Sequence, residues 1–234
     1  MTSLQRSVHA MSSDQASRVK KRGHKREEDF NDKYGKADAN INFSGASADC
    51  FLSREKEIYS ILQEKINTES TSISLKSGNT IQIHLGQIPE LTNKETYLVD
   101  SLWNGNTCVT HGISKQEQIK KLKDFSFWRK YLKKGDILCY FEDTDKSYTF
   151  FKMEDVINFI CQKCEWKFLE TGRIKGWFFN GAKNKKMQYL TYEYRRKKKQ
   201  FVLGAHGGKK GREFIQLLKQ NVAFHTDREG LVNE

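Results

Sequence analysis

Asp49 and Lys76 are the residues whose types and positions most clearly predict chemistry in this sequence. Hydrolysis of a phosphodiester needs a carboxylate that holds Mg²⁺, a means of activating water, and a cation for the developing negative charge. Asp49 lies in the short apolar segment 48–53, and Lys76 ends the alternating segment 71–76. If these two segments pair as strands, the carboxylate and the amine meet at one end of a sheet.

Three further residues extend this site or compete for it. Ser74 lies on the same face as Lys76, because side chains alternate along a strand. Asp38 competes with Asp49 as the metal ligand, and we prefer Asp49 because the apolar strand that follows would hold it rigidly. His84 shares the face if the strand is unbroken, although a lone histidine on a strand is more often structural. Purely structural roles remain open for Asp49 and Lys76. Asp49 also suits a turn or a helix cap, and Lys76 suits an exposed strand end.

The segment from Gly181 to Arg212 contains eleven lysine and arginine residues against one acidic residue, Glu193. Like charges at this density repel one another, and a bound polyanion relieves the repulsion and releases its counterions. The net charge of +12 over 234 residues favours the same class of partner. The residues predicted to contact nucleic acid are Lys183, Lys185, Lys186, Arg195, Arg196, Lys197, Lys198, Lys199, His206, Lys209, Lys210 and Arg212.

Two local structures are expected to present these cations. Residues 189–194 and 201–203 have the pattern of two strands, with a hairpin tip at 195–199 that could follow a phosphate backbone or enter a groove. Residues 204–212 have the pattern of a glycine-rich loop ahead of a helix at 213–218, whose N-terminus would favour a phosphate. A solvated hairpin and a flexible loop are the ordinary alternative.

The remaining elements follow from hydrophobic periodicity, and a hydrophobic content of 37% is enough for one sizeable core. Helices are predicted at 19–30, 54–66, 115–134 and 150–161, and strands at 41–44, 48–53, 71–76, 80–85 and 136–140. We expect a disordered polar tail at 1–18, a core at 19–165, and a basic aromatic part at 166–234 within the same globular unit. The predicted fold class is α/β (α+β), with a central mixed β-sheet flanked by helices.

Apolar segments and cysteines predict the cellular location. No apolar run approaches the roughly 18 residues of a membrane span, and the first ten residues contain no apolar leader, so we expect a cytoplasmic protein that binds no membrane. The five cysteines fit reduced thiols. Cys161 and Cys164 have zinc spacing, but no second ligand pair follows them, so buried thiols on an apolar helix face are preferred to a metal knuckle.

Three segments resemble the PD-(D/E)xK nuclease superfamily, particularly type II restriction endonucleases. Residues 44–52 are similar to the stretch that leads into the metal-binding aspartate, residues 73–84 to the strand that carries the lysine, and residues 22–30 to the preceding helix. Ser74 stands where an acidic residue is usual in that family, so Glu28, or a backbone carbonyl near Leu75, would complete the metal site.

The resemblance implies a restriction-endonuclease-like fold and cleavage of double-stranded DNA at a short specific sequence, with Mg²⁺ as cofactor. Asp49 and Glu28, or Glu27 beside it, would bind the metal, Lys76 would orient water or stabilise charge, and Ser74 would share their site. A palindromic target would call for a homodimer. Two alternatives stay open: a non-catalytic DNA- or RNA-binding protein, and a repair or recombination nuclease.

Overall fold

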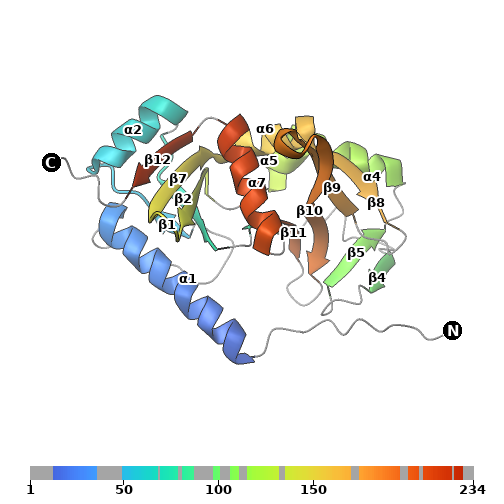
Figure 1. Ribbon diagram of the computed structural model, residues 1–234, viewed down its shortest axis with the longest axis horizontal. Helices are drawn as coiled ribbons and strands as arrows, with labels where there is room; N and C mark the ends of the chain where they lie inside the picture. Colours follow the sequence, from blue (N-terminus) through green and yellow to red (C-terminus); the bar gives the residue numbers. More distant parts are fainter. Residues whose placement is uncertain are drawn as a thin grey trace.

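The computed structural model has two β-sheets with helices packed around and between them (Figure 1). The fold class is therefore confirmed as mixed α and β, and the second sheet was not predicted. The residues that the structure describes are 13–35, 49–67, 69–78, 81–86, 97–100, 106–110, 115–131, 135–169, 174–195, 200–205, 208–222 and 224–228.

The first sheet has five strands and is mixed. Its strands, in spatial order, are β1 (Cys50–Phe51), β2 (Ser72–Ser77), β6 (Ile137–Glu142), β7 (Ser147–Lys152) and β12 (Phe224–Arg228). β2 and β6 run parallel, and every other neighbouring pair is antiparallel. The central strands β6 and β7 are buried along nearly their whole length, because each face of this sheet packs against a separate core.

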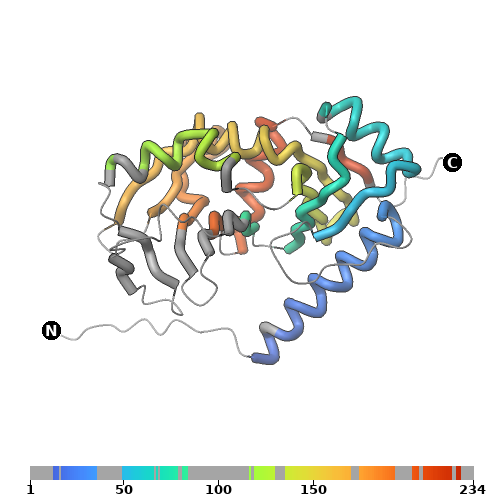
Figure 2. Tube along the Cα trace, turned by 180° about the vertical axis from the view of Figure 1, so that it is seen from behind, coloured from blue at the N-terminus to red at the C-terminus, as the bar shows by residue number. Residues whose placement is uncertain are grey.

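Alternation along β6 divides its side chains between these two cores. Ile137, Cys139 and Phe141 join the cluster formed with α1 (Ser13–Tyr34) and α2 (Glu57–Ile66). Leu138 and Tyr140 join the larger cluster on the opposite face. The first turns of α1 are exposed and extend away from the rest of the molecule in both views (Figure 1, Figure 2). The last turns of α1 thus fix the helix to the five-stranded sheet.

The second sheet has seven strands and is antiparallel throughout. The path β3-β11-β10-β5-β4 forms most of it, and β9 and β8 extend from the long strand β10. The strand bounds are β3 (Ile81–Gly86), β4 (Tyr97–Asp100), β5 (Asn106–Thr110), β8 (Glu165–Phe168), β9 (Ile174–Asn180), β10 (Lys185–Arg195) and β11 (Gln200–Ala205).

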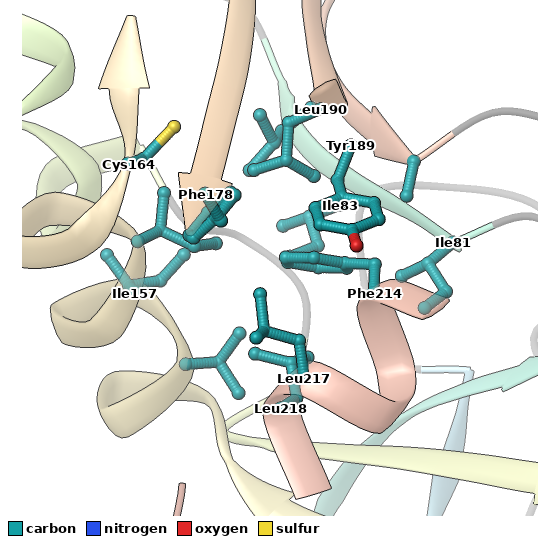
Figure 3. Packing of buried hydrophobic residues seen from close by; sticks show 14 of the residues in the cluster. Ile81, Ile83, Ile157, Cys164, Phe178, Tyr189, Leu190, Phe214, Leu217 and Leu218 are labelled. Carbon is teal, nitrogen blue, oxygen red and sulfur yellow. The ribbon is translucent and has the colours of Figure 1, made fainter. Parts of the chain in front are cut away.

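Helix α7 (Gly208–Asn221) lies between the visible strands of the two sheets (Figure 1). Its buried residues Phe214, Leu217 and Leu218 point into the larger core, where Phe178 and Tyr189 of the seven-stranded sheet meet them (Figure 3). The apolar face of α7 therefore fills the space beside the seven-stranded sheet, while its polar face remains exposed.

Strands from both sides of residue 165 contribute to each sheet. The late strand β12 joins the five-stranded sheet, whereas β3, β4 and β5 join the seven-stranded sheet. The segments 19–165 and 166–234 therefore contribute strands to the same two sheets. Among the described residues, no helix has the length and apolar character needed to span a membrane.

Most predicted elements are confirmed, with shifted bounds. The predicted helix at 54–66 is α2, and the strands at 71–76, 80–85 and 136–140 are β2, β3 and β6. The predicted strands at 189–194 and 201–203 are β10 and β11, which pair from Leu190↔Ala205 to Arg195↔Gln200. The predicted strand at 41–44 lies outside the described residues. Residues 1–18 were expected to form a disordered tail, but α1 begins at Ser13, so residues 13–18 are helical.

Two predicted helices are wrong in part. The segment 150–161 begins as strand, because Phe150 and Phe151 lie in β7, which ends at Lys152, and face different cores. Helix α6 (Met153–Lys163) starts only afterwards. The helix at 115–134 is divided into α4 (Lys115–Leu122) and α5 (Phe125–Tyr131). Asp124 causes this division, since its carboxylate accepts from Ser126 N at 2.9 Å and caps the second helix.

The glycine-rich loop predicted at 204–212 is also wrong over much of its length. Helix α7 already begins at Gly208, so Lys209, Lys210 and Arg212 lie in its first turns. The buried Gly211 faces the core side of the helix. The cations expected on a loop are therefore fixed on a helix.

Candidate active site

The Asp49 and Lys76 side chains meet at the edge of the five-stranded sheet. Lys76 Nζ donates to Asp49 Oδ2 at 2.7 Å, and Ser74 Oγ donates to the same oxygen at 3.3 Å. The Lys76 amine also donates to the carbonyl oxygen of Leu75 at 2.9 Å. The structure thus brings together three of the four residues that were predicted to be catalytic.

Strand pairing explains this geometry. Asp49 N donates to Ile73 O at 2.8 Å, and Cys50 lies opposite Ile73 in the β1–β2 ladder. The parallel ladder with β6 places Ser74 beside Leu138 and Lys76 beside Tyr140. Ser74 and Lys76 therefore share the face that lies opposite the α1 and α2 cluster.

Both members of the ion pair are largely shielded from water, since 14% of the Lys76 side chain and 13% of the Asp49 side chain are exposed. Electrostatic interactions strengthen as water is excluded. Ser74 is buried, and its hydroxyl supports the carboxylate from within the sheet. The pair is consequently held in place and yet reachable from solvent.

The donor set fits a hard cation such as Mg²⁺. Two oxygens, Asp49 Oδ2 and Leu75 O, converge on one ammonium group at 2.7 and 2.9 Å, which shows a place suited to positive charge. Mg²⁺ is usually bound by one or two carboxylates together with substrate phosphates. No group of three or more His, Cys, Asp or Glu side chains suited to a metal occurs within the described part of the chain, and this mode of binding does not require one.

Glu27, and not Glu28, lies toward this edge of the sheet. Cys50 Sγ contacts the Glu27 carbonyl at 3.8 Å. The pKa of the Cys50 thiol is raised to about 12, mainly by burial and also by the negative charges of Glu27 and Asp49, which Lys76 opposes. Both carboxylates are therefore close enough to act on one thiol. Glu28 is exposed, and its charge acts on Lys25. The structure does not bring Glu28 to Asp49.

Two arginines act around the end of β2: Arg22, which was not predicted as a site residue, and Arg212, which was predicted to contact nucleic acid. A Cβ atom placed on Gly78 would lie 3.2 Å from Nη2 of Arg22. Tyr140 donates to the Gly78 carbonyl at 2.6 Å. The pKa of Tyr140 is raised to about 12, mainly by burial and also by the negative charges of Glu142 and Asp143, while the positive charge of Arg212 opposes the rise. Nothing local in the sequence distinguishes Arg22 from the other cations of α1.

The predicted nucleic-acid contacts fall into two groups. Lys183, Lys185 and Lys186 lie at the turn between β9 and β10, and Lys209 and Lys210 lie on the first turns of α7. Lys183 pairs with Glu213 at 2.5 Å, and Lys210 Nζ donates to Gln188 Oε1 at 2.9 Å, so contacts link the turn and strand β10 to the helix. Arg212 instead acts toward Tyr140, as described above.

Two other predicted site residues, Arg195 and His84, are placed by their backbone pairing alone. Arg195 pairs through its backbone with Gln200 and Asn106. His84 pairs through its backbone with Val202, and β3 belongs to the other sheet, so His84 does not continue the strand of Ser74 and Lys76. The predicted contacts Arg196, Lys197, Lys198, Lys199 and His206, and the competing ligand Asp38, lie outside the described residues.

The prediction that Cys161 and Cys164 are buried thiols is confirmed. Cys161 and Cys164 are both buried and free, and burial raises the pKa of each thiol. Cys50 and Cys139 are likewise free and buried.

Comparisons with protein families, with curated proteins and with solved structures find no match to this chain. The candidate site is consequently supported by its own geometry, and functional assignment depends on the chemistry of its residues.

Proposed function

We propose that this protein is a Mg²⁺-dependent endonuclease that cleaves double-stranded DNA at a short specific sequence, as type II restriction enzymes do. The observation that carries the proposal is the cluster of Asp49, Ser74, Lys76 and the Leu75 carbonyl at the edge of a mixed sheet. It contains a carboxylate, a cation and a supporting hydroxyl, which are groups that phosphodiester hydrolysis uses.

Each residue has a separate role in this proposal. Asp49 and the Leu75 carbonyl would hold Mg²⁺, with Glu27 of α1 replacing Glu28 as the second acidic ligand. The metal, when bound, supplies Lewis-acid polarisation of the phosphate and of water. Lys76 then orients the attacking water or stabilises the negative charge that develops on the phosphate. Ser74 keeps the Asp49 carboxylate in position through its hydrogen bond.

The surrounding charges support a polyanionic substrate. Arg22 of α1 lies near Gly78, two residues after Lys76, and the positive charge of Arg212 on α7 acts on Tyr140, which donates to the Gly78 carbonyl. The lysines at the β9–β10 turn and on α7 extend positive charge away from this point. A DNA backbone bound across α7 would release counterions and reach the Asp49 edge.

The test is cleavage of supercoiled plasmid of mixed sequence with Mg²⁺. We expect the wild-type protein to cut, EDTA to abolish cutting, and Lys76→Ala to slow it by about 10²–10³-fold, since that is the usual effect of removing one charge-stabilising donor. Lys152→Ala is the matched control, because Lys152 also lies at the end of a strand in this sheet and pairs with Glu154 at 3.7 Å. Absence of cutting by the wild type, or full cutting by Lys76→Ala, would contradict the proposal.

The pattern of products tests the restriction-type component. A sequence-specific enzyme gives discrete plasmid fragments whose ends share one sequence, whereas a repair or recombination nuclease cuts according to DNA structure. A palindromic end sequence, together with a two-subunit mass in solution, would support a homodimer. Sequencing the fragment ends therefore separates these possibilities in one experiment.

A second candidate is a non-catalytic DNA- or RNA-binding protein, and one observation favours it. The direct contact of Lys76 with Asp49 satisfies both charges without any ligand, which is also what a structural ion pair does. This candidate predicts salt-sensitive binding that persists in EDTA with no metal-dependent turnover. The endonuclease predicts that EDTA removes product formation and leaves binding in place.

A further inference from the structure

The outer face of strands β8, β9 and β10 carries large aromatic side chains that no core uses. Along β9, Ile174, Gly176 and Phe178 are buried, whereas Trp177 and Phe179 lie on the other face. Phe179 is 57% exposed, more than any other large hydrophobic residue in the described part of the chain. Because burial of a phenylalanine contributes about 1.5–3 kcal/mol, this exposure forgoes stabilisation and points to a role in binding.

Strand register identifies the neighbours of these two rings. On β10, Lys186 lies opposite Phe179 and Gln188 lies opposite Trp177. On β8, Glu165 lies opposite Trp177, and Lys167 lies opposite Lys175. Directly paired residues share a face of the sheet. The members of this surface, called here the Trp177 face, are Glu165, Lys167, Lys175, Trp177, Phe179, Lys186 and Gln188.

The charged members of the Trp177 face are three lysines and one glutamate, so the face is positive. Glu165 pairs with Lys167 at 2.8 Å and also with Lys186. Lys167 Nζ lies 5.6 Å from the centroid of the Trp177 ring, within the range of a cation–π contact. Lys175 Nζ donates to Thr191 Oγ1 at 2.6 Å. The lysines thus surround the aromatic rings and remain close to the strand surface.

Exposed aromatic rings among lysines suit nucleotides whose bases are unpaired. Base stacking on an aromatic side chain tolerates any sequence, because every base has a flat face. In a duplex those faces are covered by neighbouring base pairs. Side chains two positions apart on a strand are about 7 Å apart, which is twice the ~3.4 Å spacing of nucleotides along a duplex strand. Bases that meet both rings must therefore be separated from one another.

We infer that the Trp177 face binds single-stranded DNA, with bases on Trp177 and Phe179 and phosphates near Lys167, Lys175 and Lys186. The choice of DNA over RNA rests on the proposed function, whereas the stacking geometry does not depend on cleavage. In a DNA-cutting enzyme, this face would hold a strand that has separated from the duplex. β8, β9 and β10 lie side by side, so one strand of DNA can cross all three (Figure 1).

The test measures binding of a fluorescein-labelled fifteen-nucleotide oligothymidine by fluorescence anisotropy in EDTA, which excludes cleavage. We expect Trp177→Ala and Phe179→Ala each to weaken binding by about fivefold or more, the usual effect of removing one stacking ring. Trp177→Phe retains a flat ring and should bind nearly as the wild type does. A fifteen-base-pair duplex should bind all three variants equally well. Because both side chains are partly or largely exposed, the variants should keep the fold, which circular dichroism checks.

Three results would overturn the inference. One is unchanged oligothymidine binding by Trp177→Ala, Phe179→Ala and the double variant. Another is an equal loss for duplex and single strand, which would make the face a general DNA contact. The third is a wild-type dimer that the double variant converts to a monomer with unchanged affinity for the single strand, which would make the face a contact between two copies. Single-strand binding without plasmid cleavage would leave this inference standing and remove the endonuclease.

Discussion

The five-stranded and seven-stranded sheets use charge in opposite ways. In the first, Lys76 and Asp49 are shielded from water, in direct contact, and supported by a buried serine hydroxyl. In the second, Lys185 and Lys186 are exposed at the start of the long strand β10, and the ion pair of Lys186 with Glu165 lies at the surface. The first arrangement shields a few groups in direct contact, whereas the second presents many cations at the surface.

This difference teaches which property each region can provide. A shielded ion pair held in fixed positions can stabilise one charge state of a reacting atom over another, because exclusion of water strengthens its interactions. Exposed cations act together on a polyanion through counterion release and do not require fixed positions. The five-stranded sheet is therefore the candidate for chemistry and the seven-stranded sheet for binding. Each prediction below should affect one region and spare the other.

The largest expected effect separates two adjacent glutamates of α1. Glu27→Gln removes the acidic residue that lies against Cys50, so we expect plasmid cleavage to fall by about 10²-fold or more, the scale set by loss of one electrostatic contributor. Glu28→Gln is the matched control, because Glu28 is exposed on the same helix. The measurement is the initial cleavage rate at saturating Mg²⁺. Equal rates for both variants would exclude a role for Glu27 in the site.

The second prediction compares one glycine from each region. Gly135 has φ +31°, and a Cβ there would lie 2.6 Å from Ser74 N and 2.7 Å from the Ile73 carbonyl carbon. A Cβ on Gly176 would instead meet side chains, with Cys164 Sγ at 2.5 Å. We expect Gly176→Ala to destabilise the protein by about 1–3 kcal/mol through overpacking. Gly135→Ala should cost more, because it crowds rigid backbone and occupies a left-handed conformation.

Urea unfolding and cleavage assays at a temperature where both glycine variants are folded test this comparison. Gly135→Ala should also slow cleavage by the folded protein, because its Cβ would displace the backbone of Ser74. Gly176→Ala should leave the cleavage rate unchanged. A slower rate in Gly176→Ala alone would show that the chemistry depends on the seven-stranded sheet, against the division made above.

Local patterns in the sequence predicted the parts of this molecule that depend on neighbouring residues. Alternation placed Ser74 and Lys76 on one face, and the apolar segment at 48–53 placed Asp49 beside them. The β10–β11 hairpin followed from two apolar segments flanking a basic turn. The sequence also allowed Glu27 to be chosen over Glu28, because Glu27 precedes Phe30 by three residues and Tyr34 by seven. Those spacings share a helix face, and both aromatic residues are buried.

Contacts between distant segments could not be predicted in the same way. β2 and β3 are separated by only three residues and yet belong to different sheets, since β2 pairs with β6 and β3 with β11. The electrostatic effect of Arg212 on Tyr140 depends on where α7 packs, and Arg212 was predicted to lie in a loop ahead of a helix at 213–218. Each of these features depends on how whole helices and strands pack against one another. The hydrophobic period of a segment, about two residues in a strand or about 3.6 in a helix, does not specify that packing.

The third prediction concerns the salt dependence of duplex binding. Lys185→Ala with Lys209→Ala removes two exposed cations from the basic surface. If each contacts one phosphate, the slope of log binding constant against log salt should become shallower by about 1.8, or 0.9 for each contact. Lys56→Ala with Lys65→Ala is the control, because these two lysines are exposed near α2, beside the other sheet. Equal slopes for both double variants would indicate that binding follows net charge and not this surface.

The smallest expected effect is a difference in pH sensitivity between the two sheets. His225 of β12 stacks on Phe150 with ring centroids 6.3 Å apart. Burial lowers the pKa of His225 first, the positive charge of Lys65 lowers it further, and Asp227 opposes them. The unfolded chain, whose histidine has a pKa of about 6.5, therefore binds a proton that the folded chain excludes. Stability should fall as the pH drops through that value.

Glu165 of the seven-stranded sheet responds in a different pH window. Hydrogen bonds from Lys167 and Lys186 lower the pKa of Glu165 to about 2, so its contribution is lost only as the pH falls below the unfolded value of about 4.3. Between pH 7.5 and 5.5 we expect the urea midpoint of the wild type to decrease, His225→Phe to flatten part of that decrease, and Glu165→Gln to leave it unchanged. If Glu165→Gln removes the decrease in the urea midpoint and His225→Phe retains it, the acid-sensitive contacts lie in the seven-stranded sheet instead.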